Sequence, residues 1–323
     1  MARYLVLPTL SGVTGHPSLG TFAVKLLEND ETMVTRCRYL WLVALVACLW
    51  TGCNKNLQTA LPKTCGSNGI DDAAIVQWKP ESLSGSAVGQ LAIEYIAHSS
   101  FFIHSPSGKV ILIDPYLSYY WLGYGFPYLG NVHADTIAVT HPHYDHDSGV
   151  FIGRPWPFDR SIPVIRDPGE YTVGDIHIYG IPGKHADPWG KDFGQINTLF
   201  LFEVGGLRIA HLGDNGPLTS ADIAALAKVD ILMMPIDGDE HILKAAEARA
   251  IIDALNPSVV IPMHYRMKDL EVPGSPRGLG DIEPWAACQT NVFQLQGNIQ
   301  VFHPTDFPQP TRILIFQHTS DSL

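Results

Sequence analysis

Apolar residues fall in short runs from about residue 90 onward, separated by glycine, proline and polar residues. Runs of this length with such boundaries, rich in β-branched and aromatic side chains, are typical of β-strands. Two of the boundaries, Pro106-Ser107-Gly108 and Gly205-Gly206, have the composition of tight turns between neighbouring strands. The pattern predicts strands over 91–96, 100–104, 110–113, 136–140, 163–165, 175–181, 198–204, 207–211, 231–235 and 259–262.

Two segments have the spacing expected of helices. Thr219 or Ser220 is suited to cap a helix that continues to about Ala227. Residues 242–255 (ILKAAEARAIIDAL) repeat apolar residues every three or four positions and stop before Asn256-Pro257. Many strands with helices between them predict a layered α/β domain built on sheets.

The N-terminal part of the chain has a different pattern. An apolar run of twelve residues, 39–50, follows Arg36 and Arg38. Crossing a bilayer takes roughly 20 apolar residues, so this run fits the core of a secretory signal better than a membrane span. Thr51-Gly52-Cys53 comes next and resembles a lipobox, whose cysteine is acylated in bacterial lipoproteins. A buried core helix that ends at Gly52 is the alternative interpretation.

The position of this signal affects the expected domain boundaries. The charged pair lies beyond residue 35, and Met33 would provide a start close to it, so residues 1–32 are expected to lie upstream of the true start. We expect residues 1–53 to hold this segment and the signal, and 54–86, rich in Ser, Gly and Pro, to be a flexible tether. Residues 87–323 then form the main folded domain. The protein would be exported and lipid-anchored through Cys53 in the bacterial cell envelope.

Cysteine usage is compatible with export. Of the five cysteines, two lie within the predicted signal and Cys53 would carry lipid. Cys65 and Cys288 remain, and they could pair in an oxidising compartment or stay free.

Charge limits the range of partners. The chain carries a formal net charge of −11, and no strongly basic patch interrupts it. Nucleic acid is therefore not expected as a partner. Bound divalent cations would reverse the sign of the field locally, so an anionic small molecule or a lipid-like substrate stays compatible. The oligomeric state is left open.

The most specific chemical signal is the run HPHYDHDSG after Thr140. His141, His143, Asp145 and His146 lie within six residues, directly after a predicted strand. Imidazole and carboxylate groups are the usual ligands of borderline divalent metals. A His-x-His pair on extended backbone directs both rings to one side, which leaves Asp145 and His146 free to face a second ion.

Four side chains cannot complete the coordination of two ions, so further ligands are expected from distant segments. Three candidates share one local pattern, in which an apolar strand ends in a polar residue: His185, Asp214 and His264. Each alone could be an ordinary loop residue, and the shared pattern is what favours a common site.

These motifs resemble those of a known family. HPHYDHDSG is similar to the His-x-His-x-Asp-His signature of the metallo-β-lactamase superfamily. The blocks GKHAD, HLGDNGPLT, VDILMMPIDG and IPMHY look like its branch of zinc-dependent hydrolases that includes ascorbate-phosphate lactonase-like proteins. The resemblance extends from about Glu94 to about Tyr265. It implies a four-layer αββα sandwich with the site at one edge between two sheets.

The resemblance also implies roles for single residues. His141, His143 and His185 would hold one ion, Asp145, His146 and His264 a second, and Asp214 would bridge them. The ions would be Zn²⁺, with Mn²⁺ or Fe²⁺ as alternatives. Asp145 would also orient the water that the two ions activate. His98, in the stretch IEYIAHSSFF, is either at the site or structural.

Several other polar and aromatic residues have two interpretations. Tyr265 could donate a hydrogen bond to substrate or simply pack. His177, His211 and His241 are expected to be structural or to support the ligands. The aromatic-rich segment 116–130 is either a cover across the sheet or a substrate-binding loop.

The expected function is hydrolysis of an ester, lactone or phosphodiester bond. Two alternatives stay open: a phospholipase-D-like phosphodiesterase that acts on lipid head groups, and a non-catalytic metal-binding envelope lipoprotein.

Overall fold

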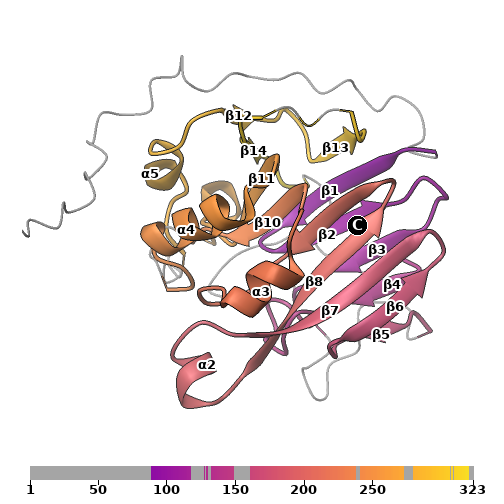
Figure 1. Ribbon diagram of the computed structural model, residues 1–323, viewed down its shortest axis with the longest axis horizontal. Coiled ribbons are helices and arrows are strands. Elements are labelled where there is room, and N and C mark those ends of the chain that lie inside the picture. The colour runs from indigo at the N-terminus through magenta and orange to yellow at the C-terminus, as the bar shows by residue number, and fades with distance from the viewer. Residues whose placement is uncertain are drawn as a thin grey trace, which may run out of the picture. The chain divides into compact units, whose positions relative to one another are not determined.

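The structure is a computed structural model, and its described part is drawn in colour in Figure 1. The chain divides into two units, Met1–Thr64 and Cys65–Leu323, and every described residue belongs to the second. The predicted signal, Cys53, the tether and most of the aromatic-rich segment lie outside the described residues. Within the described part, no helix has the length and apolar character needed to cross a membrane. The described residues are 89–117, 127, 129, 132–148, 161–237, 241–272, 279–305, 307 and 309–319.

The described strands form two sheets. The six-stranded sheet has the order β13-β1-β2-β3-β4-β5, and the eight-stranded sheet has the order β12-β14-β11-β10-β9-β8-β7-β6. The strands of the first sheet are β13 (Ile299–Phe302), β1 (Leu91–Ala97), β2 (Ser100–His104), β3 (Val110–Ile113), β4 (Thr136–Ala138) and β5 (Val164–Ile165). Those of the second are β12 (Val292–Gln294), β14 (Arg312–Ile315), β11 (Val259–Met263), β10 (Ile231–Pro235), β9 (Leu207–His211), β8 (Ile196–Val204), β7 (Ile176–Lys184) and β6 (Gly169–Val173).

Short helices accompany the second sheet (Figure 1). Helix α3 begins after Thr219, whose hydroxyl accepts a hydrogen bond from the Asp222 backbone while the Asp222 carboxylate accepts one from the Thr219 backbone. Helix α4 ends at Asn256, which adopts a left-handed conformation with φ 46°. The described helices are α2 (Trp189–Asp192), α3 (Ser220–Ala225), α4 (Ala245–Leu255), α5 (Glu283–Ala286) and the 3₁₀ turn η1 (Lys268–Leu270).

Alternating side chains of the eight-stranded sheet serve two different cores. In β8, Phe200 and Phe202 pack in the core between the sheets, whereas Leu199 and Leu201 pack with the residues of α3 and α4. In β10 the same alternation separates Ile231 and Met233 from Leu232 and Met234. A strand that is buried on both faces has no polar positions, which explains the unbroken apolar runs of β10 and β11. This sheet is therefore the inner layer between the six-stranded sheet and the helices.

The secondary-structure predictions are confirmed where the apolar pattern was clear. All ten predicted strands and both predicted helices are present, with boundaries shifted by a few residues. The turn at Gly205-Gly206 joins β8 to β9 in an antiparallel hairpin. The predicted α/β sandwich built on two sheets is likewise confirmed. The pattern missed β6, β12, β13, β14, α2 and α5.

Cys288 is disulfide-bonded in the structure. Its predicted partner, Cys65, lies outside the described residues, so that pairing stays a prediction.

Candidate metal centre

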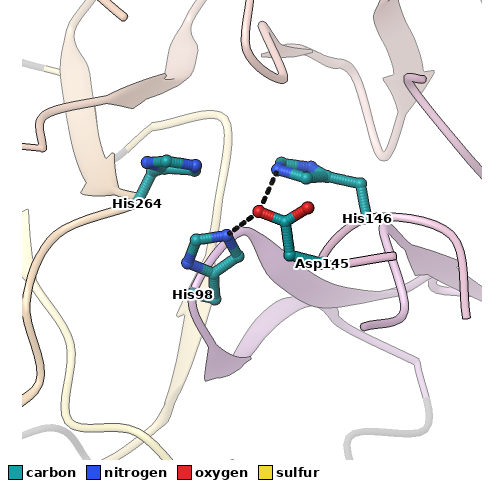
Figure 2. A group of neighbouring side chains, drawn as sticks. All are labelled: His98, Asp145, His146 and His264. Atoms are coloured by element: carbon teal, nitrogen blue, oxygen red, sulfur yellow. Dashed lines mark hydrogen bonds and ion pairs between the residues drawn. The ribbon is translucent and has the colours of Figure 1, made fainter. Parts of the chain in front are cut away.

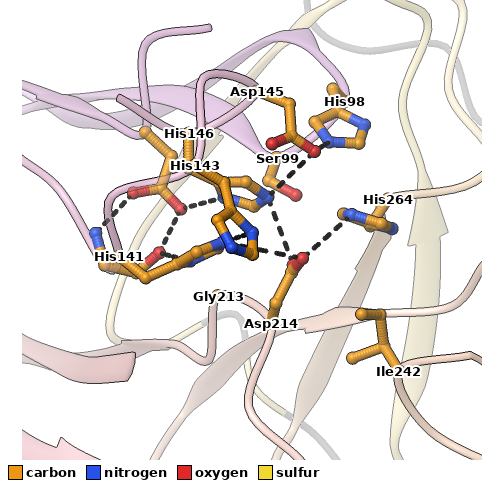
Figure 3. Close-up of polar contacts among 12 residues, drawn as sticks. His98, Ser99, His141, His143, Asp145, His146, Gly213, Asp214, Ile242 and His264 are labelled. Atoms are coloured by element: carbon orange, nitrogen blue, oxygen red, sulfur yellow. Dashed lines mark hydrogen bonds and ion pairs between the residues drawn. The ribbon is translucent and has the colours of Figure 1, made fainter. Parts of the chain in front are cut away.

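A cluster of histidines and aspartates lies where strands of both sheets end (Figure 3). The first sheet contributes the residues that follow β1, β3 and β4, and the second contributes those at or after the ends of β7, β9 and β11. Because these strand ends meet at one edge of the sandwich, residues more than a hundred positions apart become neighbours. In chain order the residues are His98, Asp114, His141, His143, Asp145, His146, His185, Asp214 and His264.

One half of the cluster, here called the histidine trio, consists of His141, His143 and His185. One nitrogen of each ring lies within 4.8 Å of those of the other two. The outer nitrogens are held by neighbours that fix the rings: His141 Nδ1 lies 3.0 Å from the Thr140 hydroxyl, and His185 Nδ1 donates to the Ala186 carbonyl at 2.9 Å. His143 Nε2 lies 3.1 Å from the Gln195 amide oxygen. The inner nitrogens therefore present lone pairs toward a common point.

The other half, here called the buried quartet, consists of His98, Asp145, His146 and His264 (Figure 2). His98 Nε2 donates to Asp145 Oδ2 at 3.2 Å, and His146 Nε2 lies 3.8 Å from the same oxygen. The ring centroids of His98 and His264 are 4.2 Å apart. All four side chains are buried, in contrast to the trio, where His143 is only half-buried.

Asp214 lies between the two halves. Its Oδ2 is 3.8 Å from the Nε2 atoms of both His141 and His185 in the trio, and 3.2 Å from His264 Nε2 in the quartet. Its Oδ1 is 3.3 Å from His146 Nε2. One carboxylate thus faces ligand atoms on both sides, as a bridging ligand must.

The turn that carries Asp214 requires the glycine before it. Gly213 has a φ of +53°, and a Cβ at this position would lie 2.5 Å from the Asn197 amide oxygen and 2.6 Å from the Thr140 side chain. Any side chain here would push the β9 turn away from the HPHYDH loop. The HLGD block therefore has a steric reason for its glycine.

Asp114 supports the cluster from behind. One of its oxygens accepts a hydrogen bond from the Thr140 backbone at 2.7 Å, and the other accepts from the Thr140 hydroxyl and from His146 Nδ1, each at 2.7 Å. Carboxylate contact at Nδ1 keeps the proton on that nitrogen and leaves His146 Nε2 free to bind a cation. Asp114, His98 and His264 all have positive φ angles, 45°, 57° and 61°, a backbone strain that tends to gather at functional sites.

Burial shapes the protonation of the trio and of His98. Burial and then the neighbouring His264 lower the pKa of His98 to about 4, against an opposing hydrogen bond from Asp145. Burial is also the main cause that lowers the pKa of His141, His143 and His185. These rings are therefore neutral near pH 7 and keep their lone pairs.

The carboxylates and His146 titrate in the opposite sense. Burial by itself would raise the pKa values of Asp145 and Asp214, but the charge of His146 outweighs it and holds both below their usual range. Burial would lower the pKa of His146, yet Asp214, Asp145 and Asp114 together raise it well above its ordinary value. The site therefore carries excess negative charge that a cation would compensate.

The hydrogen-bond pattern tests whether a metal suits these residues. Several buried atoms of the cluster find no hydrogen-bond partner within the described part of the chain: Asp145 Oδ1, His146 Nε2, His185 Nε2, Asp214 Oδ1 and both ring nitrogens of His264. An unsatisfied buried polar atom costs about 1–3 kcal/mol, so such a concentration is unusual unless a ligand is bound. Imidazole nitrogens and carboxylate oxygens converging in this way fit divalent cations such as Zn²⁺.

The structure thus brings all seven predicted ligands together and adds His98 to the quartet. Tyr265 is buried in the core beside the helices, which favours packing over substrate contact. His211 is buried and its Nε2 donates to the Ser99 carbonyl, whereas His177 is exposed on β7, away from the cluster. His241 contacts Asp237 and lies beside His264, with ring centroids 5.5 Å apart.

Sequence reasoning missed three residues that contact the cluster or its edge: Asp114, Gln195 and Asp237. Asp114 directly follows the apolar β3, the same pattern that singled out His185, Asp214 and His264, so a signal was present. Asp237 follows the apolar β10 in the same way, whereas Gln195 has no comparable signal, because its contact depends on how a loop folds.

Comparisons with known proteins agree with this geometry. The sequence profile of the beta-lactamase superfamily domain matches residues 92–264. A UPF0173 metal-dependent hydrolase from Polaromonas sp. is 30% identical over 236 residues, which cover 60% of this chain and 85% of that protein. Another from Thermus thermophilus is 26% identical over 197 residues, 54% of this chain and 83% of that one.

A solved structure supports the same assignment. It belongs to a Thermotoga maritima protein assigned as a Zn-dependent hydrolase of the metallo-β-lactamase superfamily. It is 25% identical, has a TM-score of 0.52, and matches 71% of this chain and 100% of its own. The profile match covers more than half of the chain and includes the segments that carry all seven predicted ligands. The chain therefore belongs to the beta-lactamase superfamily and, within it, to the family of UPF0173 metal-dependent hydrolases.

Proposed function

We propose that the protein is a hydrolase that uses two divalent cations, one held by the histidine trio and one by Asp145, His146 and His264. Asp214 would contribute ligand oxygens to both. The observation that carries this proposal is the placement of the Asp214 carboxylate, within 3.2–3.8 Å of nitrogens from both halves of the cluster. A single-ion site would not need ligand atoms on both sides of one buried carboxylate.

The roles of the cations, Asp145 and His98 follow from the contacts of these residues. When bound, a pair of divalent cations supplies a water acidic enough to lose a proton near neutral pH and stabilises negative charge on the substrate. Asp145 would be free to hold such a water through Oδ1, which has no hydrogen-bond partner among the described residues, while Oδ2 is held by His98. His98 is thus a positioning residue that fixes the rotamer of Asp145.

The donor set favours Zn²⁺ among the metals. The five imidazoles proposed or available as ligands suit zinc, copper, iron and nickel better than the hard cations Mg²⁺ and Ca²⁺. Mn²⁺ and Fe²⁺ remain alternatives, because availability also decides which ion is bound. Elemental analysis of the protein as purified under metal-replete conditions identifies the ion and its stoichiometry, and a value near one per chain would contradict the dinuclear site.

The proposed substrate contains an ester, lactone or phosphodiester bond. All three reactions place negative charge on oxygen in the transition state, which a pair of cations stabilises. On the resemblance of its motifs to a lactonase-like branch, we propose a lactone of a phosphorylated sugar acid as one candidate within this group. A lipid phosphodiesterase or a non-catalytic metal-binding lipoprotein would share the cluster, and substrate tests separate them.

The test compares hydrolysis by the metal-loaded protein and by ligand variants. The panel is a p-nitrophenyl ester, a simple lactone and bis(p-nitrophenyl) phosphate, each with added Zn²⁺ or Mn²⁺. Residues that only support a metal ligand typically change activity 10- to 100-fold, so H143A, D145A and D214A are expected to lose more than about 100-fold in kcat/KM. H177A is the matched control, since His177 is an exposed histidine outside the cluster.

The outcome is decisive in either direction. Turnover that requires metal, falls in all three ligand variants and persists in H177A supports the enzyme. Stoichiometric metal binding without turnover on the panel and on a lipid phosphodiester contradicts it and favours the non-catalytic binder.

We also propose that the protein is exported and anchored through acylated Cys53. The support is the sequence pattern at residues 36–53 and the participation of Cys288 in a disulfide bond, which is typical of oxidising compartments. Mass spectrometry of the N-terminal peptide from cells tests this: a diacylglyceryl group on Cys53 is expected, and a mature chain that retains residues upstream of Cys53 contradicts it.

A further inference from the structure

Exposed apolar side chains concentrate beside the histidine trio. Among the described residues, four large apolar side chains are strongly exposed, and three of them lie within one eight-residue segment: Trp189 at 46%, Phe193 at 71% and Ile196 at 58%. This segment, 189–196, is here called the aromatic lip; it contains α2, leads into β8 and begins four residues after His185. Exposed aromatic rings are costly in water, so a cluster of them next to a metal site calls for an apolar ligand.

We propose that the aromatic lip binds the apolar part of the substrate. The preferred substrates then carry an aryl group or an alkyl chain next to the bond that is cleaved. This inference rests on the proposed hydrolase function and specifies its substrate class.

The lip is fixed in place rather than loosely attached. Gly190 packs so tightly on the backbone of His185 that a Cβ would lie 1.8 Å from the His185 carbonyl oxygen. The Gly190 backbone donates to the Ala186 carbonyl at 3.1 Å, and the Gln195 backbone donates to the Trp189 carbonyl at 3.2 Å. The lip therefore keeps a defined position relative to His185, as a specificity element requires.

The lip also reaches the trio directly. The Trp189 indole meets the His143 imidazole edge to face, with ring centroids 5.2 Å apart, and Phe193 continues the surface at 5.3 Å from Trp189. Gln195, from the same segment, holds His143 through its amide. A substrate whose reacting group lies at the trio therefore has the Trp189 indole next to it. A longer apolar substituent would extend along the lip to Phe193.

Charge favours a neutral apolar group over a membrane as the occupant. Within residues 184–196 the exposed charged residues are two lysines, Lys184 and Lys191, and two aspartates, Asp187 and Asp192, so their charges balance. Surfaces that bind anionic membranes combine apolar side chains with an excess of Lys and Arg, which is missing here. An uncharged substituent held by dispersion and burial needs no such excess.

The experiment measures chain-length selectivity in matched variants. The wild-type protein, W189A, F193A and W189F are loaded with Zn²⁺, checked for metal content, and assayed with p-nitrophenyl acetate, butyrate, octanoate and phenylacetate. V272A is the control, because Val272 is an equally exposed apolar residue on the segment after η1. Each extra apolar group in a fitted site contributes roughly a 10-fold or larger preference.

We therefore expect the ratio of octanoate to acetate kcat/KM to fall roughly 10-fold or more in W189A and F193A. W189F should keep part of the preference, and V272A should keep all of it. An unchanged ratio in both alanine variants with normal metal content overturns the proposal. A second result would also overturn the proposal: the wild type binds neutral phosphatidylcholine vesicles, and the alanine variants lose this binding but keep the wild-type ratio of octanoate to acetate. That result would assign the lip to a membrane surface.

A second readout does not depend on turnover. Calorimetry on the Zn²⁺-loaded protein compares octanoate and 4-phenylbutyrate with acetate as ligands, in wild type and in W189A. Tighter binding of the apolar acids that weakens in W189A supports the lip even if no ester of the panel is hydrolysed, in which case only the proposed function fails. Equal binding of all three acids by wild type contradicts the lip.

Discussion

The two halves of the metal centre differ in the chemical groups that form and support them. The histidine trio consists of three imidazoles backed by a hydroxyl, an amide and a carbonyl, and it opens toward the aromatic lip through the half-buried His143. The buried quartet includes the carboxylate of Asp145 and is backed by a second carboxylate, Asp114. Both halves share Asp214.

This difference predicts different roles for two ions. A site with two more carboxylates at and behind its ligands attracts a cation more strongly, so the quartet should fill first in a metal titration. The trio is the half that solvent and substrate reach. We expect its ion to exchange faster and to contact the reacting group of the substrate, whose apolar part lies along the lip.

The largest effect should come from Asp114. D114A removes the acceptor of three hydrogen bonds in a fully buried site and leaves their donors unsatisfied, which should cost roughly 3–5 kcal/mol of folding stability. D114N keeps the size but presents an amide to His146 Nδ1, which favours the wrong tautomer and should weaken the quartet site by at least about 10-fold. Urea unfolding measures the first effect, and metal titration by competition with a chelator measures the second.

A folded D114N protein that binds both ions as tightly as wild type would show that the tautomer of His146 does not matter. A matched substitution at an exposed aspartate, D253N on α4, should change neither quantity.

Acidification should destabilise the metal-free protein. A buried histidine whose pKa is lowered in the folded state takes up a proton more readily when unfolded, so stability falls as the pH decreases. For His98, with a folded pKa of about 4 against 6.5, the loss extends over this window and amounts to roughly 3 kcal/mol. His146 does not add to it, because a raised pKa means that its contribution is lost at high pH instead.

The measurement is the free energy of unfolding of the chelator-treated protein between pH 7 and pH 4. The His98→Asn variant should show a shallower decrease over this range than wild type, even though the trio histidines still contribute. Identical slopes for the two proteins would show that folding does not lower the pKa of His98.

The smallest effect should come from Gln195, and it should be confined to the trio. Removing a side chain that holds a ligating histidine typically lowers metal affinity 10- to 100-fold. Q195A should therefore weaken the trio site by about this factor while the quartet site stays unchanged. Equal weakening of both sites would mean that the two halves do not behave separately; Q289A, outside the cluster, is the control.

The central strands and the placement of the seven predicted ligands could be predicted from the sequence. Strands β10 and β11 are buried on both faces, so their apolar runs are unbroken and easy to identify. His185, Asp214 and His264 follow the strands β7, β9 and β11, and the ends of strands in a sandwich meet at its edges. A polar residue that follows an apolar strand is therefore predicted to lie at an edge of the sandwich, near the ends of other strands.

Other parts could not be predicted because their contacts are not local. β6 lies at the edge of its sheet with mostly exposed residues, so it has no apolar pattern to reveal it. β12 and β14 become strands by parallel pairing next to β11, from positions 29 to 56 residues later in the chain. The aromatic lip was missed for a similar reason, because nothing in the residues around Trp189 shows that they fold against His143.

The origin of the ligands has a consequence for the lifetime of the protein. His98 and the HPHYDH loop come from one sheet, and His185, Asp214 and His264 come from the other, so bound cations would fasten the two sheets together at this edge. A ligand that binds only the folded form stabilises it by about 2.7 kcal/mol at a free concentration one hundred times its dissociation constant. Metal starvation should then expose this edge to proteases before any other part of the sandwich, and the abundance of the protein should follow the metal supply of its surroundings.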